Sequence, residues 1–207
     1  MEIPLKKGGW QMKGSLIIIA FFVLGIVVGL QFSTFNFQFS TFILYALMFC
    51  VGISIGSDTK TLKSFRSVNP RLMMLPVMTI VGTLAGTVAA SALLPHRHLF
   101  DCLAIGSGFG YYSLSSIFIT EYKGAELGTI ALLSNIMREI ITLLCAPLLV
   151  RYFGKLAPIS MGGATTMDTT LPIITRTSGQ DYVIVSIFHG FCVDFSVPFL
   201  VTFFCSI

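Results

Sequence analysis

The chain has 207 residues, of which 55% are hydrophobic and only 11% are charged, and its mean hydropathy is +0.88. About a quarter of the residues in a soluble domain are charged, so this composition excludes a soluble protein and predicts an integral membrane protein. The net charge of +4 comes mostly from short loops and indicates membrane orientation, not a nucleic-acid surface.

Apolar segments of membrane-spanning length follow one another along the chain. A transmembrane helix needs about 20 mostly apolar residues. Six segments meet this length without interruption. A seventh segment, Leu156–Thr175, is apolar at its ends and broken in the middle. We therefore predict an all-α polytopic membrane protein with six or seven membrane segments in a single domain, residues 1–207. Spans within residues 15–94 would form a scaffold, and residues 100–207 would carry a substrate and ion pathway. The six unbroken candidates are Ser15–Phe35, Thr41–Ser57, Arg71–Leu94, Cys102–Tyr122, Leu127–Tyr152 and Asp181–Phe204.

A stretch rich in glycine and serine interrupts the fourth predicted span. Residues Gly106–Ser116 contain three glycines and four serines. Their spacing, without a soluble βαβ unit around them, excludes a dinucleotide fingerprint. Within a membrane the stretch predicts a discontinuous helix whose unwound backbone lines a cavity. The alternative is a closely packed helix with small residues at its surface.

A second polar stretch, Ser160–Pro172, lies between apolar flanks. It contains adjacent glycines, four threonines, Asp168 and the helix-stopping Pro172. Non-helical backbone at membrane depth must be buried in protein or reached by water. Two interrupted segments in one small bundle are the sequence pattern that best predicts a transporter binding site. The alternative is a surface loop in which Asp168 is a solvated cap.

Arg138 and Glu139 lie side by side near the centre of the span Leu127–Tyr152. Each charge at that depth costs roughly 2.5–3.5 kcal/mol on insertion-based scales, so it needs a partner or a wet cavity. Helical spacing places Asn135, Glu139 and Thr142 on one polar face. We predict that Glu139 binds a proton, with Arg138 or a cationic substrate controlling its protonation. The alternative is a permanent structural ion pair between the two.

The last predicted span adds His189 and Asp194. A single histidine on an apolar helix is more often a packed residue than a proton relay. Asp194 has a better case for function, because a carboxylate is more costly to bury. The predicted substrate and proton pathway comprises Gly108, Gly110, Ser113, Asn135, Arg138, Glu139, Gly162, Gly163, Thr165, Thr166, Asp168 and Asp194.

Three multi-residue blocks occur in a fixed order along the chain. They are Ser107–Ser115, Leu133–Glu139 and Gly162–Pro172, followed by Arg176 and the His189–Gly190 step. Together these residues resemble the signature blocks of bacterial lysine exporters of the LysO type, and the resemblance covers roughly residues 40–207.

The resemblance implies a multi-pass antiporter in the bacterial cytoplasmic (inner) membrane. Such a protein would export L-lysine and close cationic analogues in exchange for protons. By its position in the second block, Glu139 falls where the family has an intramembrane carboxylate needed for transport. Asp168 falls in the family's Gly-Gly-Ala-Thr block. The expected partners are L-lysine, protons and the lipid bilayer, with no cofactor and no nucleic acid.

Single-chain members of that family have further spans at the N-terminus, which carry another functional carboxylate. We therefore expect a separate small membrane subunit to supply those spans. Alternatively, this chain works as a homo-oligomer without them.

Two rival classes of protein remain for a helical membrane chain. An intramembrane enzyme would use Glu139, His189 and Asp194, but the sequence has no His-Glu-x-x-His, Gly-x-Ser-x-Gly or paired-aspartate motif. The five cysteines also lack metal-ligand spacing. We therefore expect no enzyme. The second rival is an accessory subunit of a split transporter, which release of loaded amino acid would distinguish from an exporter.

Overall fold

The computed structural model describes residues 71–94 and 97–207, together with the single helical residues Leu24, Ala46, Phe49 and Ile53. The predicted spans Ser15–Phe35 and Thr41–Ser57 therefore lie outside the described residues, apart from those four. The chain divides into two compact units, Met1–Ser57 and Asp58–Ile207. Every helix whose bounds are described belongs to the second unit.

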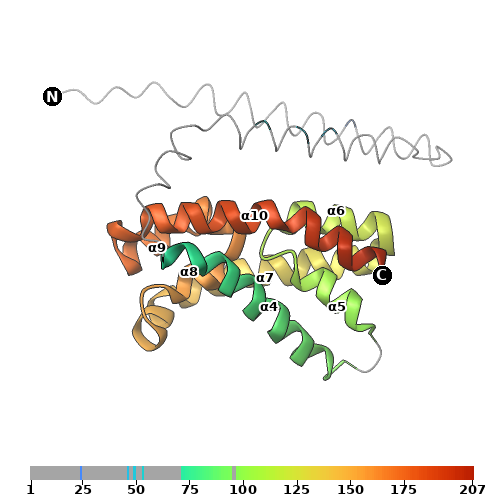
Figure 1. The fold of residues 1–207 in the computed structure, drawn as a ribbon, viewed down its shortest axis with the longest axis horizontal. Helices are drawn as coiled ribbons and strands as arrows, with labels where there is room; N and C mark the ends of the chain where they lie inside the picture. The colour runs from blue at the N-terminus through green and yellow to red at the C-terminus, as the bar shows by residue number, and fades with distance from the viewer. Residues whose placement is uncertain (1–23, 25–45, 47–48, 50–52, 54–70, 95–96) are drawn as a thin grey trace. The chain divides into compact units, whose positions relative to one another are not determined.

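The second unit is built from helices alone over its described residues (Figure 1). Three helical stretches are long and apolar enough to cross a membrane: Leu72–Ser91, Ala125–Phe153 and Gln180–Ser206. The prediction of an all-α membrane protein is therefore confirmed. The elements, in chain order, are η2 (Leu72–Met74), α4 (Leu75–Ser91), α5 (Leu99–Gly106), α6 (Tyr112–Lys123), α7 (Ala125–Phe153), α8 (Ala157–Gly162), η3 (Gly163–Met167), α9 (Leu171–Ser178), η4 (Gln180–Tyr182) and α10 (Val183–Ser206).

Glycine sets both limits of the longest helix, α7. Gly124 precedes it with φ +94°, and Gly154 follows it with φ +88°. A positive φ is accessible to glycine without a Cβ penalty, so the chain turns sharply at both points. Between them runs an uninterrupted helix of 29 residues, which exceeds the roughly 20 that a span requires.

The two predicted interruptions are both present. The fourth predicted span is divided into α5 and α6, with residues 107–111 between them. The segment Leu156–Thr175 is divided into α8, the short 3-10 helix η3 and α9. Each interruption is therefore a true break in the α-helix. Neither segment is a continuous helix that is merely rich in glycine.

Helix α10 runs the length of this unit and contacts both interrupted segments. It lies beside α9 at one end and α6 at the other (Figure 1), and it also packs against η3 and α5. Its buried side includes the small residues Ser186 and Gly190, which allow the backbones to approach closely, and also the charged residue Asp194. This placement brings α10 alongside both breaks.

Candidate functional site

The first break is a turn held by an asparagine from α7. Phe109 and Gly110 both have positive φ, of 46° and 94°. The Gly110 N–H donates a hydrogen bond to Asn135 Oδ1 at 2.8 Å, and Asn135 Nδ2 donates to the Ala131 carbonyl at 2.9 Å. A Cβ at Gly108 would lie 2.5 Å from Asn135 Nδ2, so glycine is required there. Asn135, 3% exposed, thus replaces the missing helical partners of the break.

The second break is closed by its own threonines. Gly163 turns the chain with φ +64° directly after α8. The Thr165 hydroxyl donates to the Gly162 carbonyl at 2.9 Å. The Thr166 hydroxyl lies 2.8 Å from the Gly163 carbonyl and 2.9 Å from the Ser186 carbonyl of α10. These side chains satisfy backbone groups that an unbroken helix would pair internally.

The two breaks cross in direct backbone contact. The Ala164 N–H of the second break donates to the Phe109 carbonyl of the first at 2.9 Å. A Cβ at Gly163 would lie only 2.1 Å from that same carbonyl oxygen, and one at Gly110 would lie 3.2 Å from the Gly162 carbonyl oxygen. The glycines of both blocks are therefore needed for this close approach.

Arg138 stabilises the crossing from α7. Its Nε donates to the Met161 carbonyl at 2.8 Å and its Nη2 to the Ser160 carbonyl at 3.1 Å. Its guanidinium also reaches the Thr83 hydroxyl at 3.4 Å and lies 5.9 Å from the centre of the Phe109 ring. Carbonyls at a helix C-terminus carry partial negative charge, so the cation stabilises the end of α8.

Glu139 is not the partner of Arg138 in this structure. Among the residues that the structure describes, no ion pair or hydrogen bond reaches the Glu139 carboxylate. The Glu139 side chain is partly exposed. It does not line either of the cavities that adjoin the two breaks. The role of Glu139 in proton binding stays a prediction.

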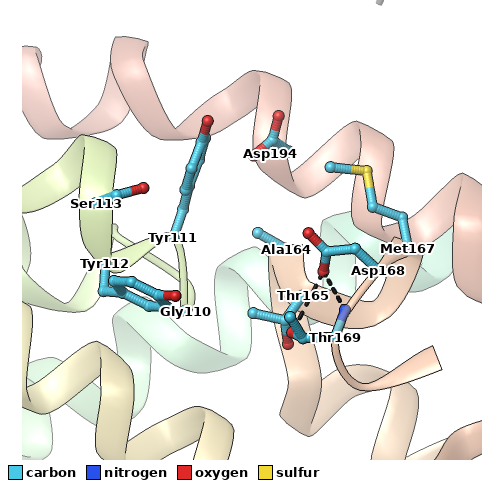
Figure 2. A pocket seen from close by; sticks show the side chains of 10 residues that line it. All are labelled: Gly110, Tyr111, Tyr112, Ser113, Ala164, Thr165, Met167, Asp168, Thr169 and Asp194. Carbon is cyan, nitrogen blue, oxygen red and sulfur yellow. Dashed lines mark hydrogen bonds between the residues drawn. The ribbon is translucent and has the colours of Figure 1, made fainter. Parts of the chain in front are cut away.

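A cavity of about 160 Å³ opens where the two breaks meet α10 (Figure 2). It combines residues that lie far apart in the sequence and brings together five of the predicted pathway residues, namely Gly110, Ser113, Thr165, Asp168 and Asp194. The remaining lining residues are Tyr111, Tyr112, Ala164, Met167 and Thr169. The cavity is thus rimmed by non-helical backbone, hydroxyl groups and two carboxylates.

The two carboxylates of the cavity differ in exposure. Asp168 is exposed, and its Oδ1 accepts a hydrogen bond from the Thr169 N–H at 2.6 Å. Asp194 is only 5% exposed and lies on α10. The two are close enough to interact electrostatically. The cavity therefore holds one solvated acid and one buried acid.

His189 has a structural environment. It is fully buried, with Nδ1 3.2 Å from the Thr166 hydroxyl and Nε2 2.9 Å from the Thr79 hydroxyl of α4. Both ring nitrogens are occupied by neutral partners, and the ring does not line the cavity. Its contacts join α4, η3 and α10, as expected for an interhelical hydrogen-bonded residue.

Sequence reasoning did not single out Tyr111, Thr83 or Thr79. Tyr111 lies inside the first block, so its position in a predicted break could have indicated that it lines the cavity. Thr83 and Thr79 lie on α4, 55 and 110 residues from their partners Arg138 and His189. No local pattern in the sequence connects residues at such separations.

Two interrupted helical segments that meet beside a polar cavity, in a protein with several apolar spans, are the arrangement in which membrane transporters build their binding sites. Comparison with known proteins specifies the class further. The sequence profile of the family described as lysine exporter LysO matches residues 19–205, and the chain belongs to this family. The prediction from the three sequence blocks is thereby confirmed, as is a multi-pass location in the bacterial inner membrane.

Two curated bacterial relatives support the family assignment. The chain is 36% identical over 188 residues to "Lysine exporter LysO" of Escherichia coli (strain K12), which covers 91% of this chain and 62% of that protein. It is 34% identical over 165 residues to "Putative lysine exporter" of Haemophilus influenzae (strain ATCC 51907 / DSM 11121 / KW20 / Rd), covering 80% of this chain and 83% of that protein. No solved structure matches the chain.

Proposed function

We propose that the chain exports L-lysine and close cationic analogues across the cytoplasmic membrane, by antiport with protons. The observation that carries this proposal is the cavity between the two crossed breaks, with Asp168 and Asp194 in its wall. Freed backbone groups and carboxylates at such a crossing suit an amino acid with an additional positive charge. The names of both curated relatives, each called a lysine exporter, support lysine as the substrate.

The membrane potential is the physical reason for coupling to protons. An inside-negative potential opposes the exit of a cation by about 2.3 kcal/mol per charge for each 100 mV. Lysine carries one net positive charge at neutral pH. Exchange of one entering proton for one leaving lysine moves no net charge and removes that electrical opposition.

Such an exchange needs a carboxylate that takes up and releases the entering proton, and we propose Glu139 for this role. It lies in the middle of α7, next to Arg138. Since the Arg138 guanidinium is engaged by the Ser160 and Met161 carbonyls, it does not neutralise Glu139 directly. No other described residue pairs with Glu139, which leaves the carboxylate available to bind and release a proton.

Lysine efflux from peptide-loaded cells that lack their own lysine exporters tests the proposal. We expect the chain to accelerate efflux and Glu139→Gln to abolish it while the protein remains in the membrane. Glu126→Gln is the matched control, because it makes the same change on α7 at an exposed carboxylate that pairs with Arg97. Full efflux in Glu139→Gln would contradict the assignment of Glu139.

The cellular assay also separates lysine export from the other candidate functions. Efflux that collapses when the proton gradient is dissipated, but not when only the sodium gradient is removed, supports proton antiport. Dependence on a separate small membrane subunit stays a prediction, and full export by this chain alone would contradict it. Absence of efflux from verified membrane-inserted protein would instead favour an accessory role.

A further inference from the structure

Asp194 is a buried carboxylate without a partner among the described residues. It is 5% exposed, yet no hydrogen bond or ion pair from the described part of the chain reaches its oxygens. It lines the cavity at the crossing, in company with Tyr111 and Asp168 (Figure 2). A buried ionised carboxylate is strongly disfavoured unless a cation or hydrogen-bond donors compensate it. Asp194 is therefore suited to bind a cation that enters the cavity.

The charges around the cavity specify a cation. Its lining contains two carboxylates and, among the described residues, no arginine or lysine. Arg138, the nearest cation on the adjoining α7 segment, directs its guanidinium to the Ser160 and Met161 carbonyls instead. The two acidic side chains lie in the wall of the same cavity, and a bound cation would relieve the repulsion between their like charges.

The opposite wall of the cavity suits a carboxylate. Helix α6 begins at Tyr112 with no side-chain cap, and Ser113 of its first turn lines the cavity. The Tyr112 N–H donates to the Gly110 carbonyl at 2.9 Å, whereas the next N–H groups of a helix lack internal partners and favour negative charge. An amino acid with two ammonium groups and one carboxylate would place its ammonium groups on the two aspartates and its carboxylate on the N–H groups of α6.

We propose that this cavity is the substrate site. In it, Asp194 and Asp168 bind the two ammonium groups of lysine, and the α6 N-terminus binds the α-carboxylate. This inference rests on the proposed function and adds the recognition groups. It separates the substrate site from Glu139, which does not line the cavity. L-Norleucine lacks the side-chain ammonium and leaves one of the two carboxylates uncompensated, so it does not bind.

Equilibrium binding of radiolabelled L-lysine to the purified full chain in detergent is the test. We expect Asp194→Asn to weaken binding by roughly 10–100-fold, the loss typical of one charge-assisted hydrogen bond. L-Norleucine at a large excess is expected not to displace lysine. The control is Asp181→Asn, which changes an exposed acid in η4 outside the cavity and retains wild-type binding. Size-exclusion profiles and helicity of both variants establish that they fold.

A second measurement uses the wild-type protein and so does not depend on the folding of a variant. A hydrophobic carbodiimide reacts with protonated carboxyl groups in apolar surroundings, and mass spectrometry of the digested protein locates the adduct. We expect lysine, but not L-norleucine, to suppress the adduct at Asp194.

Wild-type affinity in Asp194→Asn, or an Asp194 adduct that saturating lysine leaves unchanged, would overturn the site while leaving lysine export intact. If the wild-type chain neither binds nor exports lysine, the proposed function itself fails.

Discussion

The close approach of the two breaks makes a quantitative prediction for Gly163→Ala. The new Cβ would lie 2.1 Å from the Phe109 carbonyl oxygen, closer than any real contact, and φ at this position is +64°. Positive φ costs a residue with a Cβ about 1–3 kcal/mol. Relief of the clash in a packed interior costs about 1–3 kcal/mol more. Separation of the backbones also removes the Ala164 to Phe109 hydrogen bond, a further loss of about 0.5–1.5 kcal/mol.

Gly179→Ala is the matched control for the backbone strain. Gly179 also has positive φ, of 108°, but no described atom lies within 4 Å of the position that a Cβ would occupy there. Its substitution therefore carries a positive-φ cost, at ψ 164° where Gly163 has ψ −126°, without the clash or the lost hydrogen bond. The expected difference between the two variants is the sum of the last two contributions, about 1.5–4.5 kcal/mol.

Titration of the purified protein from mild detergent into SDS, followed by circular dichroism, measures the free energy of unfolding of both variants. Gly163→Ala should lose considerably more than Gly179→Ala. Equal losses, within about 0.5 kcal/mol, would contradict a tight contact at the crossing of the breaks, since each variant would then lose only its positive-φ strain.

Two further substitutions examine the side chains that hold the breaks. Asn135→Leu should lower the free energy of unfolding by about 1–3 kcal/mol, because the buried Gly110 N–H loses its acceptor, and the same titration measures this loss. Arg138→Lys keeps the charge but cannot reproduce the planar fork that reaches the Ser160 and Met161 carbonyls, so we expect lysine efflux to fall sharply while membrane insertion is retained. Unchanged efflux in that variant would mean that charge alone suffices at this position.

The interruptions could be predicted from the sequence because their signal is local. Gly106–Ser116 and Ser160–Pro172 each concentrate glycines and hydroxyl side chains within one apolar segment, and backbone physics in a membrane forbids such stretches as exposed loops. What could not be predicted was that the Phe109 carbonyl accepts the hydrogen bond that joins the second break to the first. A residue with an unremarkable side chain supplies this contact through its backbone, in an uncommon conformation with φ +46°.

The partner of Arg138 shows a different limit. The sequence left open a permanent pair with Glu139, but neighbouring residues in a helix point in different directions and do not face each other. Arg138 instead reaches Met161 and Ser160, more than 20 residues away, and Thr83 on α4. The helical position of a charge could be inferred from spacing, whereas its partners depend on how the helices pack.

The hydrogen bond from the Ala164 N–H to the Phe109 carbonyl has a consequence for chimeras of this chain with its relatives. Each break presents to the other a surface made mostly of backbone, and Gly163 fits only where the Phe109 turn keeps its shape. Segments 99–123 and 157–178 therefore have to match each other, although the whole of α7 separates them in the sequence. A chimera that exchanges both segments with those of a relative preserves the contact between the breaks. A chimera that exchanges only one segment places a break from one protein against a break from another.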